Sequence, residues 1–352
     1  MNYLGSFRDH VQFKYARFIF GQRDKSSMSN IVVTFEPGTG QREVLTNILD
    51  KLGRVVFVTD LSQADRAREL ASAEVLISWS PSRELRPEEC KTLTHAAMMQ
   101  LLSAGADHIP YSMLPLGLTI ASNPGAYAEQ MSEHVLAMIL AVTKNLMDRH
   151  EKLAKGIFDQ VSENRTLRGS ICAILGFGGI GKATARLLKC YGVEIYGINT
   201  TGKTDEPIKF IGTLKDLEMV LRLANIVVIT LPLTNSTRGL VGKRELDWMK
   251  DDAILVNVAR GEIIDEGALY QKLKAFPNFT AAIDAWWIEP LSHGEFHTKY
   301  PFFELTNVLG SPHNSGNVHG AFVKGAAFAA ENVKRFLKHE PVLGIVRRSD
   351  YA

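Results

Sequence analysis

Residues 170–204 read SICAILGFGGIGKATARLLKCYGVEIYGINTTGKT. The first part, ICAIL, has the apolar pattern of a buried strand, and glycines follow it at positions 176, 178 and 181. A helical pattern and a second strand pattern, VEIYGI, come next. A strand, a G-x-G-x-x-G turn, a helix and a strand in this order predict a βαβ unit that binds a dinucleotide.

Each glycine of this turn answers a separate physical need. Gly176 permits a tight turn, Gly178 lets the backbone approach a pyrophosphate, and Gly181 lets the helix pack closely on the strand. The helix, which we expect to begin near Ile180, directs its free N–H groups and positive dipole end at the phosphates. The predicted phosphate contacts are Gly176, Gly178, Gly179, Ile180 and Gly181.

The end of the second strand carries Asn199, where an acidic side chain would bind a ribose 2′-OH and repel a 2′-phosphate. Asn removes that negative charge, and Thr200, Thr201 and Lys203 add hydroxyl donors and a cation. Such a set can hold a phosphate by charge-assisted hydrogen bonds. We therefore expect NADP(H) to be accepted and preferred; in the alternative, Asn199 bonds the 2′-OH of NAD(H) and Lys203 lies in solvent.

Strand-like and helix-like runs alternate on both sides of this segment, from Ile31 onward. This alternation predicts an α/β fold with parallel sheets flanked by helices. Because the pattern occurs twice, we expect two Rossmann-like domains, one inserted into the other, and a long helix from about Glu129 to about Leu153. The predicted limits are residues 1–125 and 317–352 for the outer, substrate domain and residues 126–316 for the dinucleotide-binding domain.

Composition excludes several classes of protein. The formal net charge of the 352 residues is +2, so we expect no nucleic-acid partner. No apolar run approaches the ~20 residues of a membrane helix, so we expect no membrane span. Three cysteines without paired spacing, Cys90, Cys172 and Cys190, argue against disulfides and zinc, and a reducing cytoplasm is the expected location.

The first thirty residues mix aromatic and basic side chains without the apolar core of a secretory signal. We interpret residues 1–30 as an extension of the outer domain. Two explanations stay open: an arm that packs on the surface or on a partner subunit, or a start upstream of a natural beginning at Met28.

Three polar side chains come just after buried strand patterns: Arg260, Glu289 and His313. Ligands bind at the carboxyl ends of parallel strands, so these side chains can converge. A guanidinium clamps a carboxylate through two hydrogen bonds, and histidine exchanges protons near neutral pH. A carboxylate on the other ring nitrogen fixes the tautomer of the histidine and favours its charged form. Asp265 has the position of a helix N-cap instead.

Together the motifs GFGGIG, LPLTNSTRGLV, VNVARGEIIDEGAL, AIDAWWIEP and SPHNSG resemble the D-isomer-specific 2-hydroxyacid dehydrogenase family, over roughly residues 31–343. The resemblance implies that Arg260 binds the substrate carboxylate and that Glu289 pairs with His313 as acid and base. It also implies a homodimer formed through the long helix.

The resemblance further implies the positions that contact ligands. For the cofactor it adds Leu231, Pro232, Thr237, Val258, Ala259, Asp284, His313 and Gly316. The turn SAGADHI resembles the carboxylate cradle of the family, so the expected substrate contacts are Ala104 and Gly105, with Trp79 and Ser80 facing the same cleft.

Two departures from the family pattern bear on the site. Trp286 and Trp287 stand where smaller or single aromatic residues are usual; they pack under the site loop or narrow the substrate pocket. His293, His297 and His319 could mimic a metal cluster, but we interpret them as loop and helix residues and expect no metal.

The expected activity is reversible hydride transfer between NADP(H) or NAD(H) and a small 2-oxo or 2-hydroxy acid, similar to that of glyoxylate/hydroxypyruvate reductases. Two alternatives stay open. One is a nicotinamide-sensing corepressor of similar fold, in which the cofactor drives dimerisation. The other is oxidation of phosphite or formate; formate chemistry needs no proton acid, so the Glu289–His313 pair argues mildly against it.

Overall fold

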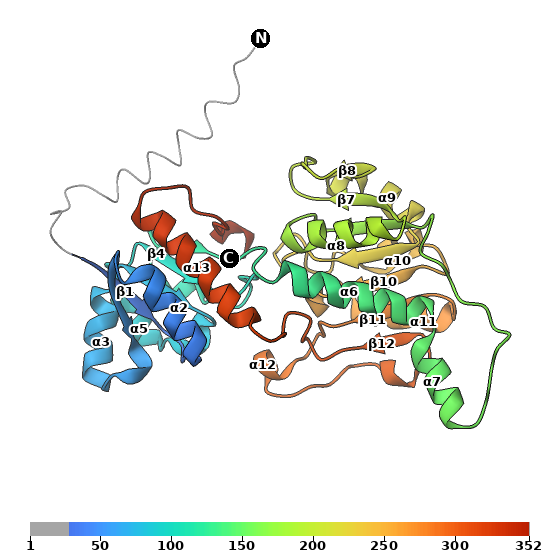
Figure 1. Ribbon diagram of the computed structural model, residues 1–352, viewed down its shortest axis with the longest axis horizontal. Helices are drawn as coiled ribbons and strands as arrows, with labels where there is room; N and C mark the ends of the chain where they lie inside the picture. Colours follow the sequence, from blue (N-terminus) through green and yellow to red (C-terminus); the bar gives the residue numbers. More distant parts are fainter. Residues whose placement is uncertain (1–27, 352) are drawn as a thin grey trace, which may run out of the picture. The chain divides into compact units, whose positions relative to one another are not determined.

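The computed structural model describes residues 28–351, so most of the expected extension, residues 1–27, lies outside the described chain. The described chain forms two compact units (Figure 1). The outer unit contains residues up to Leu102, Pro110–Ala121 and Ala329–Val346; the inner unit contains Ser103–Ile109, Ser122–Phe328 and the residues from Arg347 onward. Along the chain, most residues of the inner unit thus lie between segments of the outer unit.

The outer unit is built on a five-stranded parallel sheet in the order β2-β1-β3-β4-β5. Its strands are β1 (Ser29–Val33), β2 (Gly53–Phe57), β3 (Val75–Ser78), β4 (Met98–Leu101) and β5 (Thr119–Ala121). Its helices are α2 (Thr39–Leu49), α3 (Gln63–Ser72), α4 (Pro81–Glu84), α5 (Pro87–Thr92) and the second half of α13 (Ala321–Leu337).

The inner unit is built on a seven-stranded parallel sheet in the order β12-β11-β10-β9-β6-β7-β8. Its strands are β6 (Ile171–Leu175), β7 (Glu194–Ile198), β8 (Phe210–Gly212), β9 (Ile226–Ile229), β10 (Ile254–Asn257), β11 (Thr280–Ile283) and β12 (Val308–Gly310). Its helices are α6 (Ala128–Thr143), α7 (Leu146–Ala154), α8 (Gly179–Cys190), α9 (Leu217–Leu223), α10 (Lys243–Trp248), α11 (Glu266–Ala275), α12 (Pro290–His293) and the first half of α13.

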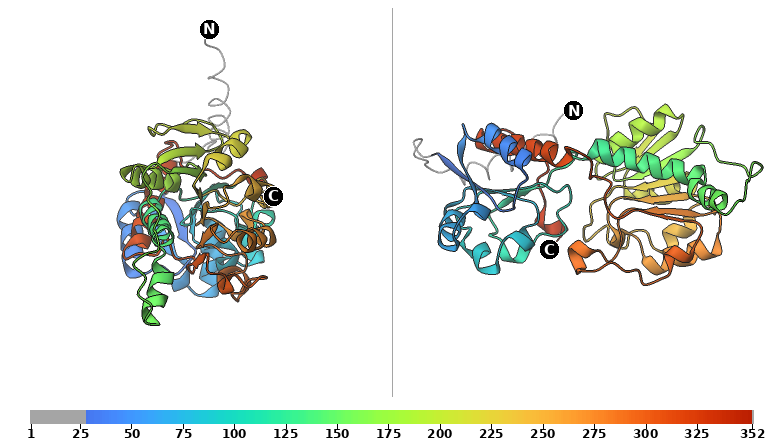
Figure 2. Two further views of the ribbon diagram at one scale, coloured as in Figure 1. Left: turned by 90° about the vertical axis from the view of Figure 1, so that its right-hand side faces the viewer. Right: turned by 60° about the horizontal axis from the view of Figure 1, so that its bottom comes forward.

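Strand periodicity explains why helices cover both faces of this sheet (Figure 2). Successive side chains of a strand point to opposite faces, and strands buried on both faces are apolar throughout. In β6, Cys172 and Ile174 pack with α6 and α8, whereas Ala173 and Leu175 pack in the opposite core with α9 and α11. The predicted fold class, two Rossmann-like units of parallel sheets flanked by helices, is confirmed.

The prediction of one continuous helix from about Glu129 to Leu153 is wrong. The structure has two helices, α6 and α7, separated at Lys144 and Asn145. Asn145 has a φ of 49°, in the left-handed region, which asparagine tolerates better than most residues with a Cβ. The turn sends α7 away from the sheet, as both figures show.

The predicted domain limits stay predictions. The two compact units of the structure assign some segments to the other side of these limits. Residues 103–109, 122–125, 317–328 and 347–351 pack with the inner unit, although the prediction placed them in the outer domain. The predicted C-terminal helix is α13, and Asp265 caps α11 as expected, because its side chain accepts a hydrogen bond from Ala268 N at 2.7 Å.

Candidate active site

The glycine turn has the geometry that dinucleotide binding requires. Gly176 has a φ of 101°, and a Cβ there would lie 2.6 Å from Leu231 N. A Cβ on Gly181 would lie 2.6 Å from Gly176 O, so the helix packs where only glycine fits. At Gly178 a Cβ would meet no protein atom within 4 Å, so the space beside that residue is open. The first N–H groups of α8, from Gly179, point out of the helix end without helical partners.

The loop after β7 is organised by the side chain of Asn199. Its Oδ1 accepts hydrogen bonds from Thr201 N at 3.0 Å and Gly202 N at 2.7 Å, and its Nδ2 donates to Lys203 O at 2.9 Å. Gly202 takes a φ of 63° at the bend. Asn199 therefore shapes the loop without adding a carboxylate at position 199, and Thr200 lies exposed on it.

The segment after β9, Leu231–Thr237, is closed by a threonine. Thr237 Oγ1 donates to Pro232 O at 2.6 Å and accepts from Thr234 N at 2.8 Å. Because Leu231 N lies against Gly176, this segment borders the glycine turn. The predicted positions Leu231, Pro232 and Thr237 therefore belong to one ordered loop at the carboxyl edge of the sheet.

Arg260 follows β10 and is held by polar neighbours that the sequence analysis did not single out. Asn257 Nδ2 donates to Arg260 O at 2.9 Å, and its Oδ1 accepts from Ala259 N at 3.1 Å. Arg260 Nε donates to Asp107 Oδ2 at 3.0 Å, and Nη1 donates to Ala259 O at 2.7 Å. Val258 and Ala259 are buried beneath this turn.

Asp107 brings the predicted cradle turn to Arg260. A Cβ on Gly105 would overlap Arg260 Nη2, so glycine is required for the guanidinium to lie against this backbone. Ala104 precedes it in the same turn. Asp107 Oδ1 is buried and has no hydrogen-bond partner among the described residues. The acid two positions after the cradle glycine in SAGADHI was the signal that could have identified it.

The expected histidine–carboxylate pair is formed. His313 Nδ1 lies 2.7 Å from Glu289 Oε2, and Glu289 Oε1 also accepts from Trp286 N at 2.7 Å. Burial opposes ionisation of Glu289, but the hydrogen bond to His313 and the charges of His313 and Arg260 outweigh it, so the pKa of Glu289 is lowered. Glu289 therefore stays ionised at neutral pH.

The arginine shares one electrostatic neighbourhood with this pair. Burial opposes the charge of Arg260, but Asp107 first and Glu289 second overcome that effect and raise the Arg260 pKa. Arg260, Glu289 and His313, which are separated in the sequence, are thus brought together within the inner unit.

Asp284 holds the turn that carries His313. The Asp284 side chain has no exposed surface, and its oxygens accept from Ser311 Oγ at 2.6 Å, Asn314 N at 3.1 Å and Ser315 N at 3.2 Å. Burial opposes its ionisation, but the hydrogen bonds from Ser311 and Ser315 lower its pKa. In this arrangement Asp284 binds protein groups, and its expected contact with the cofactor stays a prediction.

Two side chains around Asp284, Ser311 and His134, were missed from the sequence. His134 Nε2 lies 3.0 Å from Ser311 Oγ, so α6 supports the same turn. His313 N donates to Asp284 O at 2.8 Å, and His313 takes a φ of 49°. A left-handed non-glycine residue persists only where its surroundings over-determine it, and such residues cluster at functional sites.

Both tryptophans pack beneath the site rather than standing free. Trp286 Nε1 donates to Ser311 O at 2.8 Å, and Trp287 Nε1 donates to Ile264 O at 2.7 Å while its ring stacks on Phe302. Trp286 also lines a largely apolar hollow of about 520 Å³ beside the His313–Glu289 pair. The other lining residues are Pro290, Leu291, Phe296, Phe303, Gly310, Ser311 and Pro312.

The remaining predicted positions lie elsewhere. Trp79 and Ser80 belong to the outer unit, where both backbone N–H groups donate to Glu84, so their expected role stays a prediction. Gly316 lies in the inner unit, and a Cβ there would lie 3.7 Å from Tyr127 Cβ.

Two of the three histidines that could mimic a metal cluster have other neighbours. His293 Nδ1 accepts from Glu289 N at 3.2 Å, and His297 lies 3.5 Å from Glu295. Within residues 28–351 no group of three or more His, Cys, Asp or Glu side chains could hold a metal ion. No helix in that range is long and apolar enough to cross a membrane.

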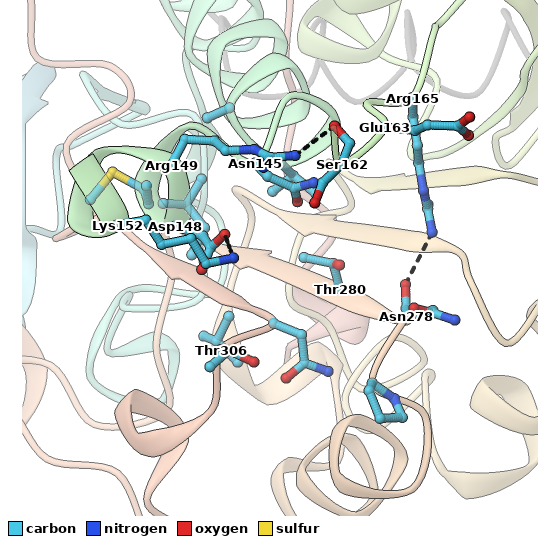
Figure 3. A pocket seen from close by; sticks show the side chains of 17 residues that line it. Asn145, Asp148, Arg149, Lys152, Ser162, Glu163, Arg165, Asn278, Thr280 and Thr306 are labelled. Carbon is cyan, nitrogen blue, oxygen red and sulfur yellow. Dashed lines mark hydrogen bonds and ion pairs between the residues drawn. The ribbon is translucent and has the colours of Figure 1, made fainter. Parts of the chain in front are cut away.

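A second hollow lies at the opposite edge of the seven-stranded sheet (Figure 3). Thr280 and Val308, the first residues of β11 and β12, line it together with the segment between α6 and β6. Arg149 Nη2 donates to Ser162 O at 2.9 Å and Arg165 Nη2 to Asn278 O at 3.2 Å, as the dashed lines mark. This hollow is at the amino ends of the strands, away from the site at their carboxyl ends.

Comparisons with known proteins agree with this geometry. Residues 136–315 match the family described as D-isomer specific 2-hydroxyacid dehydrogenase, NAD binding domain. A glyoxylate reductase of Aeropyrum pernix is 30% identical over 272 residues, which are 74% of this chain and 80% of that protein. A D-3-phosphoglycerate dehydrogenase of Methanocaldococcus jannaschii is 27% identical over 85% of this chain, and the match spans only 56% of that protein.

A solved structure described as a putative formate dehydrogenase from Pyrobaculum aerophilum superposes with a TM-score of 0.77 at 28% identity. The alignment covers 91% of this chain and 99% of that one. The chain belongs to the D-isomer-specific 2-hydroxyacid dehydrogenase family. It is an NAD(P)-dependent oxidoreductase that acts on 2-hydroxy acids, as expected.

The Asp107–Arg260 pair makes stability depend on pH. Burial opposes ionisation of Asp107, but the charge of Arg260 and its hydrogen bond outweigh burial and lower the Asp107 pKa. A lowered folded-state pKa stabilises the protein above the unfolded-state value of about 3.9, and this contribution is lost as pH falls through the folded-state value. We expect Asp107→Asn to lower the free energy of unfolding by about 1–3 kcal/mol at pH 7.

Urea unfolding of both proteins at pH 7 and pH 3 checks this prediction, since the difference between them should shrink at the lower pH. Asp60→Asn is the matched control: Asp60 also has a pKa lowered by an arginine, Arg42, but the pair is exposed. It should change stability little. A difference for Asp107→Asn that is equal at both pH values would contradict the prediction.

Proposed function

We propose that this chain reduces small 2-oxo acids of the glyoxylate and hydroxypyruvate class to 2-hydroxy acids, with His313 as the acid and Arg260 as the carboxylate-binding group. The observation that carries the proposal is the 2.7 Å contact between His313 and Glu289 in the electrostatic neighbourhood of Arg260. An arginine, a histidine and its orienting carboxylate are the groups that this reaction requires.

The residues divide the chemistry as follows. Arg260, with Nε and Nη1 bonded to Asp107 and Ala259, keeps Nη2 toward Gly105, where a carboxylate can accept hydrogen bonds from the arginine and the cradle backbone. Glu289 binds Nδ1 of His313, which leaves Nε2 to exchange a proton with the substrate oxygen. In the reductive direction His313 donates that proton as the alkoxide forms, and in the oxidative direction it removes it.

The inner unit fits a nicotinamide dinucleotide. The open space at Gly178 beside the first turn of α8 suits a pyrophosphate, and no carboxylate at position 199 repels a 2′-phosphate. The cofactor would be held by three segments: residues 176–181, the 199–203 loop and the Leu231–Thr237 loop. Its nicotinamide would lie toward Val258, Ala259, Asp284, His313 and Gly316. When bound, the reduced cofactor supplies hydride to the carbonyl carbon of the acid.

The alternatives make different predictions for a simple assay. A corepressor would bind the cofactor without turning over any acid. A phosphite or formate dehydrogenase would reduce NAD(P)⁺ with those substrates, and formate oxidation would not need the His313–Glu289 pair. Nicotinamide absorbance followed with glyoxylate, hydroxypyruvate, formate and phosphite separates the three functions, and turnover of the first two alone supports the proposal.

Variants of His313 and Arg260 should fail in different ways. His313→Gln removes the proton donor, so kcat should fall by about 100-fold or more, with cofactor affinity unchanged. Arg260→Lys keeps the charge beside Asp107 but loses the fixed Nη2 donor of the planar guanidinium, so KM for glyoxylate should rise about 10-fold, with a smaller effect on kcat. His297→Gln, in the exposed loop, is the control. Near-normal steady-state constants in either site variant would refute the assigned roles.

Cofactor choice should depend on Asn199. We propose that NADP(H) is preferred, and Asn199→Asp tests this because an aspartate can accept the same hydrogen bonds from Thr201 and Gly202. Its charge would repel a 2′-phosphate, so the kcat/KM ratio for NADPH over NADH should fall about 10-fold or more. Lys215→Ala, on the exposed surface after β8, is a control that should leave the ratio unchanged. A wild-type preference for NADH would disprove the proposal.

We also propose a homodimer through the α7 arm, which we define as residues 146–161. Its large apolar side chains are exposed: Leu146, Met147, Leu153, Ile157, Phe158 at 73% and Val161 at 89%. The arm projects from the inner unit in both views, and contiguous exposed apolar surface marks an association site. A second copy of the chain can cover it by two-fold symmetry.

Light scattering of the purified protein should give twice the chain mass of 39.0 kDa. The double variant Phe158→Glu/Val161→Glu should give the mass of one chain, because charges disfavour burial of the arm. Leu116→Glu, at a residue 91% exposed in the outer unit, should not change the mass. A wild-type protein with the mass of one chain would overturn the proposal.

We propose the cytoplasm as the location of the protein, because all three cysteines are free in the structure. We propose a small 2-oxo or 2-hydroxy acid and a second copy of the chain as its partners.

A further inference from the structure

The residues after Val346 form a short ordered segment that packs with the inner unit. Val346 N still donates to Ile120 O in the outer unit, but the chain from Arg347 onward belongs to the inner unit. Asp350 N donates to Arg347 O at 3.0 Å and Tyr351 N donates to Arg348 O at 2.9 Å, which closes a 3₁₀ turn. We call residues 347–351 the closing segment.

The closing segment is fixed to a loop of the site. Asn235 N donates to Asp350 O at 2.8 Å. Asn235 lies between Pro232 and Thr237, in the loop ordered by the Thr237 hydroxyl after β9. A backbone hydrogen bond at the residue before Tyr351 leaves that side chain little freedom to move away from the carboxyl edge of the seven-stranded sheet.

Tyr351, next to the anchored Asp350, lies in the same electrostatic neighbourhood as the Arg260–Asp107 pair. Its side chain is half-buried and interacts electrostatically with both Asp107 and Arg260. Burial first, and the charge of Asp107 second, raise the pKa of the Tyr351 hydroxyl, so it is protonated at neutral pH and can donate a hydrogen bond. The Tyr351 hydroxyl is thus an uncharged hydrogen-bond donor in the neighbourhood of Arg260.

The space beside Arg260 has groups that are ready for a ligand. Arg260 uses Nε and Nη1 for Asp107 and Ala259, and the described residues offer Nη2 no hydrogen-bond acceptor. The buried Asp107 Oδ1 also lacks a partner there, and Gly105 leaves no Cβ in the way. Nη2 can donate to a ligand carboxylate, whereas Asp107 Oδ1 is an acceptor that only a donor, such as the hydroxyl of a 2-hydroxy acid, could satisfy.

We propose that Tyr351 is a further substrate-binding residue, whose hydroxyl donates a hydrogen bond to the carboxylate that Arg260 holds. The inference rests on the proposed function, since it assigns that carboxylate to a 2-oxo acid. The charge of the arginine attracts the acid, and the tyrosine adds a directional contact that a rigid, two-torsion side chain provides at small entropic cost. The closing segment thereby links substrate binding to the loop expected to border the cofactor.

Tyr351→Phe tests this proposal because it removes only the hydroxyl. KM for glyoxylate should rise about 10-fold, whereas kcat should stay within about twofold and KM for the cofactor should not change. Tyr191→Phe, at an exposed tyrosine just after α8, is the matched control and should alter neither constant. Removal of residues 347–352 should reproduce the higher KM for glyoxylate.

Three outcomes would overturn the proposal while leaving the reductase activity intact. The first is an unchanged KM for glyoxylate in Tyr351→Phe. The second is a lower KM for glyoxylate, which would mean that Tyr351 obstructs the substrate. The third is a decrease in kcat with no change in KM. A purely structural role would lower the melting temperature of Tyr351→Phe together with the affinity for the cofactor, and that result would also count against it.

A binding experiment separates failure of this proposal from failure of the proposed function. Oxamate carries the carboxylate of a 2-oxo acid but is not reduced. If the wild-type protein reduces no acid, calorimetric titration of the cofactor-loaded protein with oxamate still reports on the site. An affinity about 10-fold weaker in Tyr351→Phe would support the assignment of Tyr351. Equal affinity in the two proteins, or no binding to either, would reject it.

Discussion

The buried carboxylate of Asp284 is the constraint on which the site depends. It accepts hydrogen bonds from Ser311, Asn314 and Ser315, and so it ties the turn after β12 to the end of β11. His313 sits within that turn at a φ of 49°, a conformation that only such restraint makes stable. The restraint aims its imidazole at Glu289, and without it the His313–Glu289 pair would lack a fixed geometry.

A second constraint governs the arginine. Arg260 could reach many positions on its flexible stem, but Asp107 and the Ala259 carbonyl hold two sides of the guanidinium. Gly105 allows the third side to lie against backbone. The cost of burying the charge is offset by Asp107. The same geometry explains why the cradle turn packs with the inner unit.

The glycine turn and the polar residues around Arg260 and His313 lie at the carboxyl ends of the strands of one sheet. Apolar strands buried on both faces carry little chemistry, so function concentrates in the loops at their carboxyl ends. The glycine turn, the Leu231–Thr237 loop, Arg260 and the His313 turn follow β6, β9, β10 and β12 of this sheet. Family membership agrees with that arrangement, because the matched region, residues 136–315, contains all four.

The sequence by itself determined the fold class and the glycine turn, because periodicity and short motifs are local and each glycine has a steric reason. The pairing of His313 with Glu289 was implied by the family resemblance of the motifs that carry them. The sequence did not reveal Asp107, Asn257, Ser311 or His134, since a polar residue in a loop shows nothing of a partner far along the chain. Nor did it show the break at Asn145, where one left-handed residue interrupts a pattern that is helical on both sides. Only the tertiary structure decided that Asp107 meets Arg260 and that Tyr351 lies near both, because packing across the carboxyl edge of the sheet joins segments that no spacing rule connects.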